Sequence, residues 1–200
     1  MELERQLAEY LDLGKKSEAA TLALRTWGDE LFGFLVYHLR DDVAASDVFS
    51  QLTEDFWRSL STFRRRCSVR TWLYLLARNA AARYRQTPWN AAGRRTGDAA
   101  FDAMVASFPS RTPVWMQTEV KDRFGRLREA LEPDDQSLLV LRVDRGLQWD
   151  DIALIFLQTE MPEAMEIKRE SARLRKRFQA VKAELHRMAV EAGLKDDITD

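Results

Sequence analysis

The chain has 200 residues, with 31 Lys and Arg against 32 Asp and Glu, one cysteine and two histidines. A single cysteine excludes a disulfide framework, and Cys67, His38 and His186 are too few and too scattered for a zinc site. No apolar run approaches the ~18 residues of a membrane-spanning helix, and the N-terminus lacks a signal-peptide pattern. We therefore expect a cytoplasmic protein with no membrane segment, no metal and no cofactor.

The net charge of -1 conceals a strong segregation of charge along the chain. Every charged residue between positions 61 and 95 is arginine, and basic residues again outnumber acidic ones over 168–187. Residues 41–55 carry only acidic charges. Basic segments attract phosphates through counterion release whatever the net charge, although many basic helices are only solvated. Two such segments with aromatic neighbours favour a nucleic acid partner.

Apolar residues recur at intervals of three and four, which predicts an all-α fold. A first helical block, residues 17–86, should contain three helices that share a core. We expect Ser46 to cap the second helix, Ser68 to cap the third, and Pro88 to stop the third. The predicted inner faces are Leu24, Trp27, Leu31, Phe34, Leu35 and His38; Val48, Phe49, Leu52, Phe56 and Leu60; and Trp72, Leu73, Leu76, Ala77 and Ala80.

Residues 87–113 contain prolines and glycines without sustained periodicity, so we interpret them as a linker. A second helical block begins near Val114, where Pro133 should open one helix and Gly146 should end it. A short helix over 149–157 and a long helix over 171–189 are expected to follow. The predicted buried stripe of the long helix is Leu174, Phe178, Val181, Leu185 and Met188.

Two groups of side chains are candidate DNA contacts. The second block has the element order of a helix-turn-helix domain: a helix, a turn with glycine, a second helix and then a basic helix. In such a domain the last helix contacts base edges and phosphates. In the first block, a loop and the helix after it carry arginines that would clamp phosphates of single-stranded DNA. The candidates are Arg173, Arg175, Lys176 and Arg177 in the second block, and Arg64, Arg65, Arg66, Arg70, Arg78, Asn79 and Arg83 in the first.

Three aromatic residues accompany these arginines. Trp72 has the spacing of a core residue rather than of a base-stacking surface, and the roles of Tyr74 and Tyr84 stay open. His38 falls on an apolar face and is expected to be a core histidine. The chain has no phosphate-binding loop, dinucleotide fingerprint or metalloprotease motif. We therefore do not expect an enzyme.

An acidic and polar face is predicted on the helix over residues 47–60. Such a face is either solvated or a docking surface for a basic protein partner, and both interpretations stay open. The face consists of Asp47, Gln51, Glu54, Asp55 and Arg58.

Two sets of motifs stand in a fixed order about a hundred residues apart. The first comprises Trp27-Gly-Asp-Glu-Leu-Phe-Gly-Phe34, Asp47-Val-Phe-Ser-Gln51, Phe56-Trp-Arg-Ser-Leu60 and Thr71-Trp-Leu-Tyr-Leu-Leu-Ala-Arg-Asn79. The second comprises Leu131-Glu-Pro-Asp-Asp-Gln136, Leu141-Arg142 and Gly146-Leu-Gln-Trp-Asp-Asp-Ile-Ala153. Together they resemble bacterial RNA polymerase sigma factors of the extracytoplasmic-function (ECF) group.

The resemblance implies two helical domains: sigma domain 2 over residues 1–88 and a helix-turn-helix sigma domain 4 over 118–190, with a linker over 89–117 and an acidic tail over 191–200. It implies a non-catalytic subunit that docks on core RNA polymerase through Asp47, Gln51, Glu54 and Asp55. The loop over 63–69 and the helix bearing Asn79 would open the minus-ten element, and the last helix would bind the duplex minus-thirty-five element. Whether an anti-sigma factor binds the chain stays open.

The sequence departs from the family pattern at two places. The docking helix reads Asp47-Val-Phe-Ser-Gln51, where the family usually has Asp-Leu-x-Gln-Glu. The turn over residues 157–169 is longer than the corresponding turn in the family. The added residues extend the turn, lengthen a helix or bind a partner. Two other functions stay open: a helix-turn-helix regulator that acts without polymerase, and a sigma-like protein-interaction module.

Overall fold

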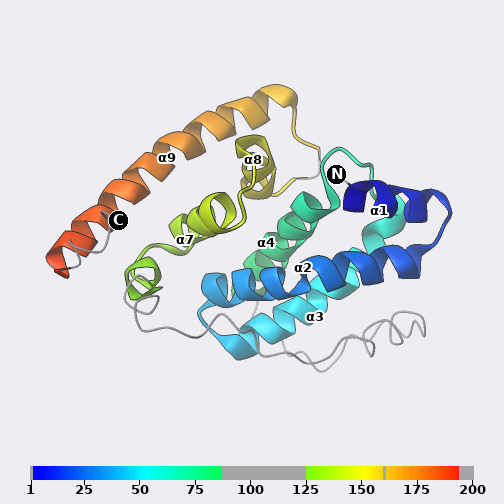
Figure 1. Ribbon diagram of the computed structural model, residues 1–200, viewed down its shortest axis with the longest axis horizontal. Helices are drawn as coiled ribbons and strands as arrows, with labels where there is room; N and C mark the ends of the chain where they lie inside the picture. The colour runs from blue at the N-terminus through cyan, green and yellow to red at the C-terminus, as the bar shows by residue number, and fades with distance from the viewer. Residues whose placement is uncertain (1, 87–124, 160, 194–200) are drawn as a thin grey trace. The chain divides into compact units, whose positions relative to one another are not determined.

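The computed structural model describes residues 2–86, 125–159 and 161–193, and this part of the chain is helical without strands (Figure 1). The expected all-α class is confirmed. The chain divides into two compact units, Met1–Pro113 and Val114–Asp200. The expected linker over 89–117, the proline stop at Pro88 and residues 194–200 of the acidic tail lie outside the described residues.

The first unit is built from α1 (Glu2–Asp12), α2 (Lys16–Leu39), α3 (Asp42–Ser59), the 3-10 turn η1 (Leu60–Thr62) and α4 (Val69–Gln86). Its core lies where α2, α3 and α4 pack on one another, and the predicted inner faces supply it. Phe34 packs edge-on against Tyr74 with ring centroids 5.3 Å apart, and Phe56 packs against Trp72 at 5.4 Å. Trp72 and His38 are buried, as expected. Tyr74, whose role the sequence left open, is a core residue.

The N-terminus of α3 differs from the prediction. The helix begins at Asp42, and the Oδ1 atom of Asp41 accepts hydrogen bonds from the backbone N–H of Val43 at 2.8 Å and of Ala44 at 3.1 Å. Ser46 is therefore inside the helix and is not its cap. The cap moves upstream because Ala44 and Ala45 are buried, so the chain must already be helical there to place them in the core.

The predicted cap of α4 is correct. The Ser68 hydroxyl accepts a hydrogen bond from the backbone N–H of Thr71 at 3.0 Å, and the helix begins at Val69. This bond satisfies one of the N–H groups that a helix leaves unpaired in its first turn. The cap fixes where the preceding loop ends.

Helix α1 was not predicted. It buries Leu7 and packs on α2. Two of its carboxylates reach residues more than fifty positions further along the chain: Asp12 contacts Arg65 between α3 and α4, and Glu4 contacts Val69 at the start of α4. The first helix is therefore part of the packed unit.

The second unit contains α7 (Pro133–Leu139), the π-helical turn η4 (Val140–Asp144), α8 (Trp149–Leu157) and α9 (Ala164–Glu191). Pro133 opens α7 with Asp134 and Asp135 in the first turn, as predicted. Gly146 follows η4 with a left-handed backbone, φ 65°, which a residue without Cβ adopts readily. The predicted stripe of the long helix is confirmed: Leu174 and Val181 are buried, and Phe178, Leu185 and Met188 pack against the core.

The start of α9 is a correction to the sequence prediction. The helix begins at Ala164, about two turns before the expected start at Ser171. A reciprocal capping box fixes this start: the Glu163 side chain accepts from the backbone of Glu166, and Glu166 accepts from the Glu163 N–H at 2.8 Å. Most of the added residues therefore lengthen the helix rather than the turn.

Candidate nucleic-acid interface

The arginine loop, residues 63–68, connects η1 to α4 and is anchored by an aromatic contact. The Phe63 ring stacks on Trp72 at 4.2 Å between centroids with an interplanar angle of 15°. Arg64, Arg65 and Arg66 are exposed. The loop therefore has a packed base and a solvent-facing basic edge, and such an edge attracts the phosphates of a nucleic acid.

Two acidic residues of α1 hold the arginine loop at its middle and where it enters α4. The Arg65 guanidinium donates to Asp12 Oδ1 at 2.6 Å and to the Ala8 carbonyl at 3.4 Å, and Arg65 has a left-handed backbone, φ 54°. Glu4 accepts from the backbone N–H of Val69 at 3.1 Å and of Arg70 at 3.5 Å. The hydrogen bond from Arg65, together with its charge, lowers the pKa of Asp12. Helix α1 thus restrains the loop through these contacts.

The arginines of α4 divide into different roles. Arg70 donates to both carboxylate oxygens of Glu30, at 2.7 and 3.0 Å, and Arg83 is ion-paired with Asp55. Arg78 is 6% exposed, so its side chain belongs to the interior of the unit. The sequence placed all three in one DNA-contacting row. The structure gives Arg70 and Arg83 carboxylate partners within the protein and leaves Asn79, partly exposed, on the same helix.

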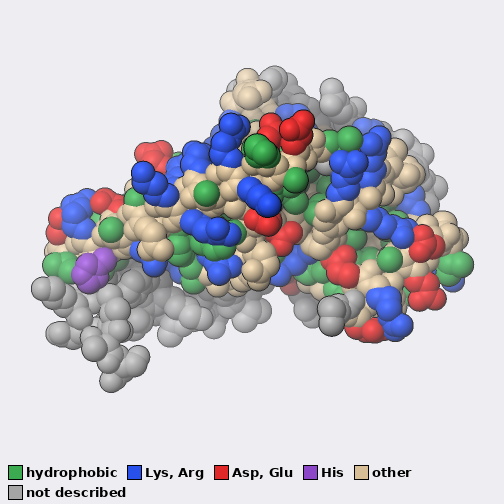
Figure 2. Space-filling model, turned by 90° about the horizontal axis from the view of Figure 1, so that it is seen from above, with side chains coloured by type: hydrophobic (Ala, Val, Ile, Leu, Met, Phe, Trp, Pro, Cys, Tyr) green, Lys and Arg blue, Asp and Glu red, His purple; other side chains and the backbone are tan. Residues whose placement is uncertain are grey.

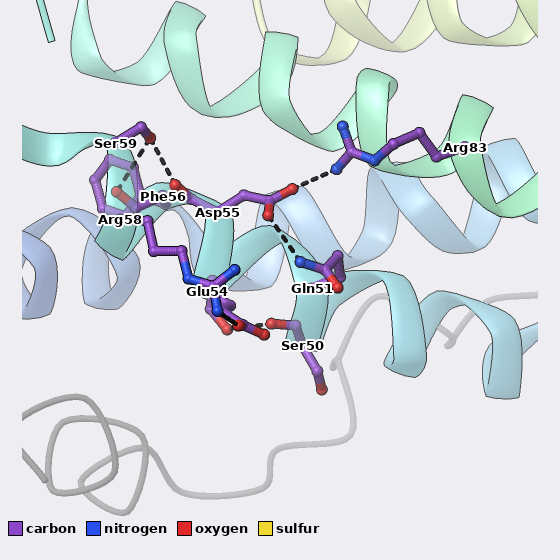
Figure 3. Close-up of polar contacts among 9 residues, drawn as sticks. Ser50, Gln51, Glu54, Asp55, Phe56, Arg58, Ser59 and Arg83 are labelled. Carbon is purple, nitrogen blue, oxygen red and sulfur yellow. Dashed lines mark hydrogen bonds and ion pairs between the residues drawn. The ribbon is translucent and has the colours of Figure 1, made fainter. Parts of the chain in front are cut away.

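The acidic face of α3 is not the open surface that its sequence indicates. Glu54 is 4% exposed and paired with Arg58, so the expectation that it faces outward is wrong. Figure 3 shows Asp55 between two partners: Gln51 donates to it at 2.7 Å, and Arg83 approaches from α4. Asp47 is partly exposed. Glu54 and Asp55 are therefore each held by partners within the protein, and Arg83 ties Asp55 to α4.

The basic residues of α9 also separate by their contacts. Arg177 donates to Asp135 at 2.5 Å and lies 3.9 Å from Asp134, so it joins α9 to the first turn of α7. Arg173 pairs with Glu170 one turn earlier and keeps an exposed side chain. Arg175 and Lys176 are exposed. Figure 2 shows Lys and Arg side chains spread along this helix.

Helix α8 fixes the position of α9 through two contacts. The buried Ser171 hydroxyl donates to Asp150 at 2.5 Å. Trp149, at the start of α8, packs edge-on against Phe178 at 5.5 Å, with the guanidinium of Arg142 5.0 Å and that of Arg175 5.8 Å from its ring centroid. Cation–π contacts of this kind restrain an arginine without burying its donors. The Trp149 ring therefore restrains the Arg175 side chain, which lies on the exposed basic face of α9 with Arg173 and Lys176.

Among the described residues, no group of His, Cys, Asp and Glu could hold a metal ion. None of the described helices is long and apolar enough to cross a membrane. The functional residues that sequence reasoning missed are the acidic partners Glu4, Asp12, Glu30 and Asp150. Their separation from the residues they bind leaves no local pattern in the sequence.

Comparison with known proteins agrees with the geometry of the first unit. Residues 23–90, which span most of α2, all of α3, the arginine loop and α4, match the family model Sigma-70 region 2. The RNA polymerase sigma-H factor of Pseudomonas aeruginosa is 27% identical to the chain over 164 residues, which cover 77% of this chain and 82% of that protein. These two matches support a bacterial RNA polymerase sigma factor that acts in transcription initiation.

Proposed function

We propose that this chain is an ECF-type sigma factor that binds core RNA polymerase and promoter DNA in the cytoplasm. Two sigma domains, residues 1–88 and 118–190, would contact the promoter at two places. The observation that carries the proposal is the ordered arginine loop of the first unit, which lies within the segment that matches Sigma-70 region 2. The exposed basic face of α9 in the second unit supports it.

The first unit would bind the minus-ten element as it opens. Arg64 and Arg66 extend from a loop that Phe63 and α1 already hold in place, so little ordering entropy is lost on binding. Phosphate contacts and capture of unstacked bases would offset the few kcal/mol that each unstacked step costs. Asn79 would contribute from α4, whereas Arg65, Arg70, Arg78 and Arg83 would position the surface from within the protein. This opening requires binding energy and no catalytic residue.

The second unit would bind the duplex minus-thirty-five element through α9. Arg173, Arg175 and Lys176 expose their side chains along the first half of this helix, where a recognition helix contacts bases and phosphates. Arg177 would act indirectly, because its carboxylate partners on α7 hold the helix in position.

The core polymerase would dock on α3. Asp47 and Gln51 retain partial exposure and would contact a basic polymerase surface directly. Asp55 is partly exposed but shared with Gln51 and Arg83, and Glu54 is buried. We propose that Glu54 and Asp55 shape the docking helix, and that Asp47 carries more of the direct contact.

A pull-down with purified bacterial core RNA polymerase, followed by run-off transcription from a genomic promoter library, tests this function. Stable binding and discrete start sites are the expected result. Binding to duplex DNA with no effect of added core enzyme would instead favour a regulator that acts without polymerase. The Asp47→Ala variant should bind core enzyme more weakly, with Asp42→Ala as a matched control on the same helix.

A further inference from the structure

The middle arginine of the arginine loop is held by the chain itself. The Arg65 guanidinium donates to Asp12 Oδ1 at 2.6 Å and to the Ala8 carbonyl at 3.4 Å. Both acceptors lie toward the C-terminus of α1, where the helix dipole favours a cation. Arg64 and Arg66, on either side of Arg65, are exposed. One of three consecutive positive charges is therefore matched by a carboxylate of the same chain.

The backbone at Arg65 accompanies this contact. Among the described non-glycine residues, only Arg40, Arg65 and Gln158 have a positive φ, an uncommon conformation for a residue with a Cβ atom. Arg40 and Gln158 are the C-caps of α2 and α8, where a left-handed residue is usual. Arg65 lies between η1 and α4 and ends neither of them. Its left-handed backbone therefore goes with the contact to α1 rather than with the end of a helix.

The Asp12–Arg65 pair lies at the surface of the first unit. The side chains of Arg65 and Asp12 are 42% and 66% exposed. The hydrogen bond from Arg65 lowers the pKa of Asp12, so this carboxylate is charged at neutral pH. A pair so exposed adds little to stability. A cation gains affinity for a nucleic acid by replacing the counterions of its phosphates, and a cation already matched by a carboxylate contributes less to that exchange.

We propose that Asp12 is an internal competitor for phosphate, which occupies Arg65 and so lowers the affinity of the arginine loop for nucleic acid of any sequence. Arg64 and Arg66 stay exposed for the promoter. Glu4 binds only backbone N–H groups at the start of α4, so it restrains the loop without neutralising an arginine of the loop. This inference rests on the proposed function and deepens it, because it divides the three arginines between promoter binding and an internal restraint on that binding.

The test compares the full-length wild type with Asp12→Asn, which removes the charge and nearly keeps the shape of the side chain. Binding to a labelled single-stranded oligonucleotide of random sequence is measured by fluorescence anisotropy over a series of salt concentrations. Asp12→Asn should bind about two- to fivefold more tightly at low salt. Its slope of log affinity against log salt should be steeper by about 0.7, the value for one added phosphate contact on a single strand. Circular dichroism checks that the variant is folded.

Two further variants separate the masking of Arg65 from a general change of charge. If Asp12 acts through Arg65, then Asp12→Asn/Arg65→Ala should bind with the affinity and salt slope of Arg65→Ala alone. Glu9→Gln is the matched control, because Glu9 is exposed on the same helix and the substitution removes the same charge. This control should keep the salt slope of the wild type.

Weaker or unchanged binding of Asp12→Asn would overturn the inference. So would a gain of affinity that persists without Arg65 or that Glu9→Gln reproduces, since neither gain would come from a released arginine. Run-off transcription with core RNA polymerase is the separate readout of the proposed function. A wild-type holoenzyme that starts at no promoter would overturn that function, whereas the oligonucleotide measurements decide whether Asp12 masks Arg65.

Discussion

Individual arginines in this protein differ in their binding partners and in their exposure to solvent. Arg70 lies against both oxygens of Glu30 in a partly buried pair, whereas Arg66, four residues earlier, is exposed in the arginine loop. The residue type is the same at both positions. Their roles differ because a charge beside a partly buried carboxylate stabilises the fold, and a charge in solvent remains available to a phosphate.

A pair of substitutions separates these two roles. Arg70→Ala should lower the free energy of unfolding of the first unit by about 1–3 kcal/mol, because it leaves Glu30 without its bidentate partner. Arg66→Ala should change that free energy by less than about 0.5 kcal/mol and weaken binding to single-stranded minus-ten DNA. Urea denaturation and fluorescence anisotropy measure the two quantities. Equal losses of stability in the two variants would contradict a structural role for Arg70 and a DNA-binding role for Arg66.

The Asp12–Arg65 pair should give a pH-dependent contribution to stability. Because the pKa of Asp12 is lowered in the folded protein, the contribution is present above the ordinary aspartate pKa of about 3.9 and is lost as pH falls through the folded value. Wild type should therefore be more stable than Asp12→Asn near neutral pH, and the difference should disappear in acid. Thermal melts of both proteins across this range, at low salt, provide the measurement. A difference that persists in strong acid would show that the pair is not its source.

At the scale of helices, α1 acts as a brace for the arginine loop. Its Glu4 carboxylate accepts from the first N–H groups of α4, where the helix dipole favours a negative charge. Its Asp12 holds Arg65, and its Leu7 is buried in the unit. The loop is therefore fixed at its middle and at its C-terminal end by a helix that lies far from it in the sequence.

Limited proteolysis tests this brace, because trypsin cleaves after arginine and the loop contains three of them in succession. Glu4→Ala should increase the rate of cleavage at Arg64–Arg66 several-fold, since cleavage follows the population of the locally opened state. Glu2→Ala is the matched control: Glu2 lies on the same helix, and its side chain pairs with the neighbouring exposed Arg5. Equal cleavage rates in the two variants would contradict a bracing role.

At the scale of the whole molecule, each of the two compact units has its own buried residues. Phe56 is fully buried in the first unit and Leu174 in the second. The folding stability of such a chain should not depend on a single hydrophobic core. The segregation of charge follows the same division, since the arginine loop belongs to one unit and the basic helix to the other.

Calorimetry should therefore resolve two transitions. Phe56→Ala should destabilise one of them by about 3–5 kcal/mol and Leu174→Ala the other by about 2–5 kcal/mol, because each removes a fully buried side chain. Each variant serves as the control for the other. A single transition that both substitutions shift together would mean that the units fold as one.

The sequence by itself determined the helices from α2 onward, their inner faces and the resemblance to sigma factors. Those features depend on contacts between residues three and four apart, so the periodicity that buried Leu31, Trp72 and Leu174 could be seen in the chain alone. The cap at Ser68 is equally local, because its hydroxyl accepts from a backbone N–H three positions later.

Only the tertiary structure decided which charged residues remain available for DNA and polymerase. Arg65, Arg83 and Arg177 take partners 53, 28 and 42 positions away, and no local pattern marks such pairs. The burial of Ala44 moved the start of α3 to Asp42, and the capping box at Glu163 moved the start of α9 to Ala164. Local interactions therefore specified the helices. Whether a charged side chain is paired within the protein or stays exposed depended on the packing of residues far apart in sequence.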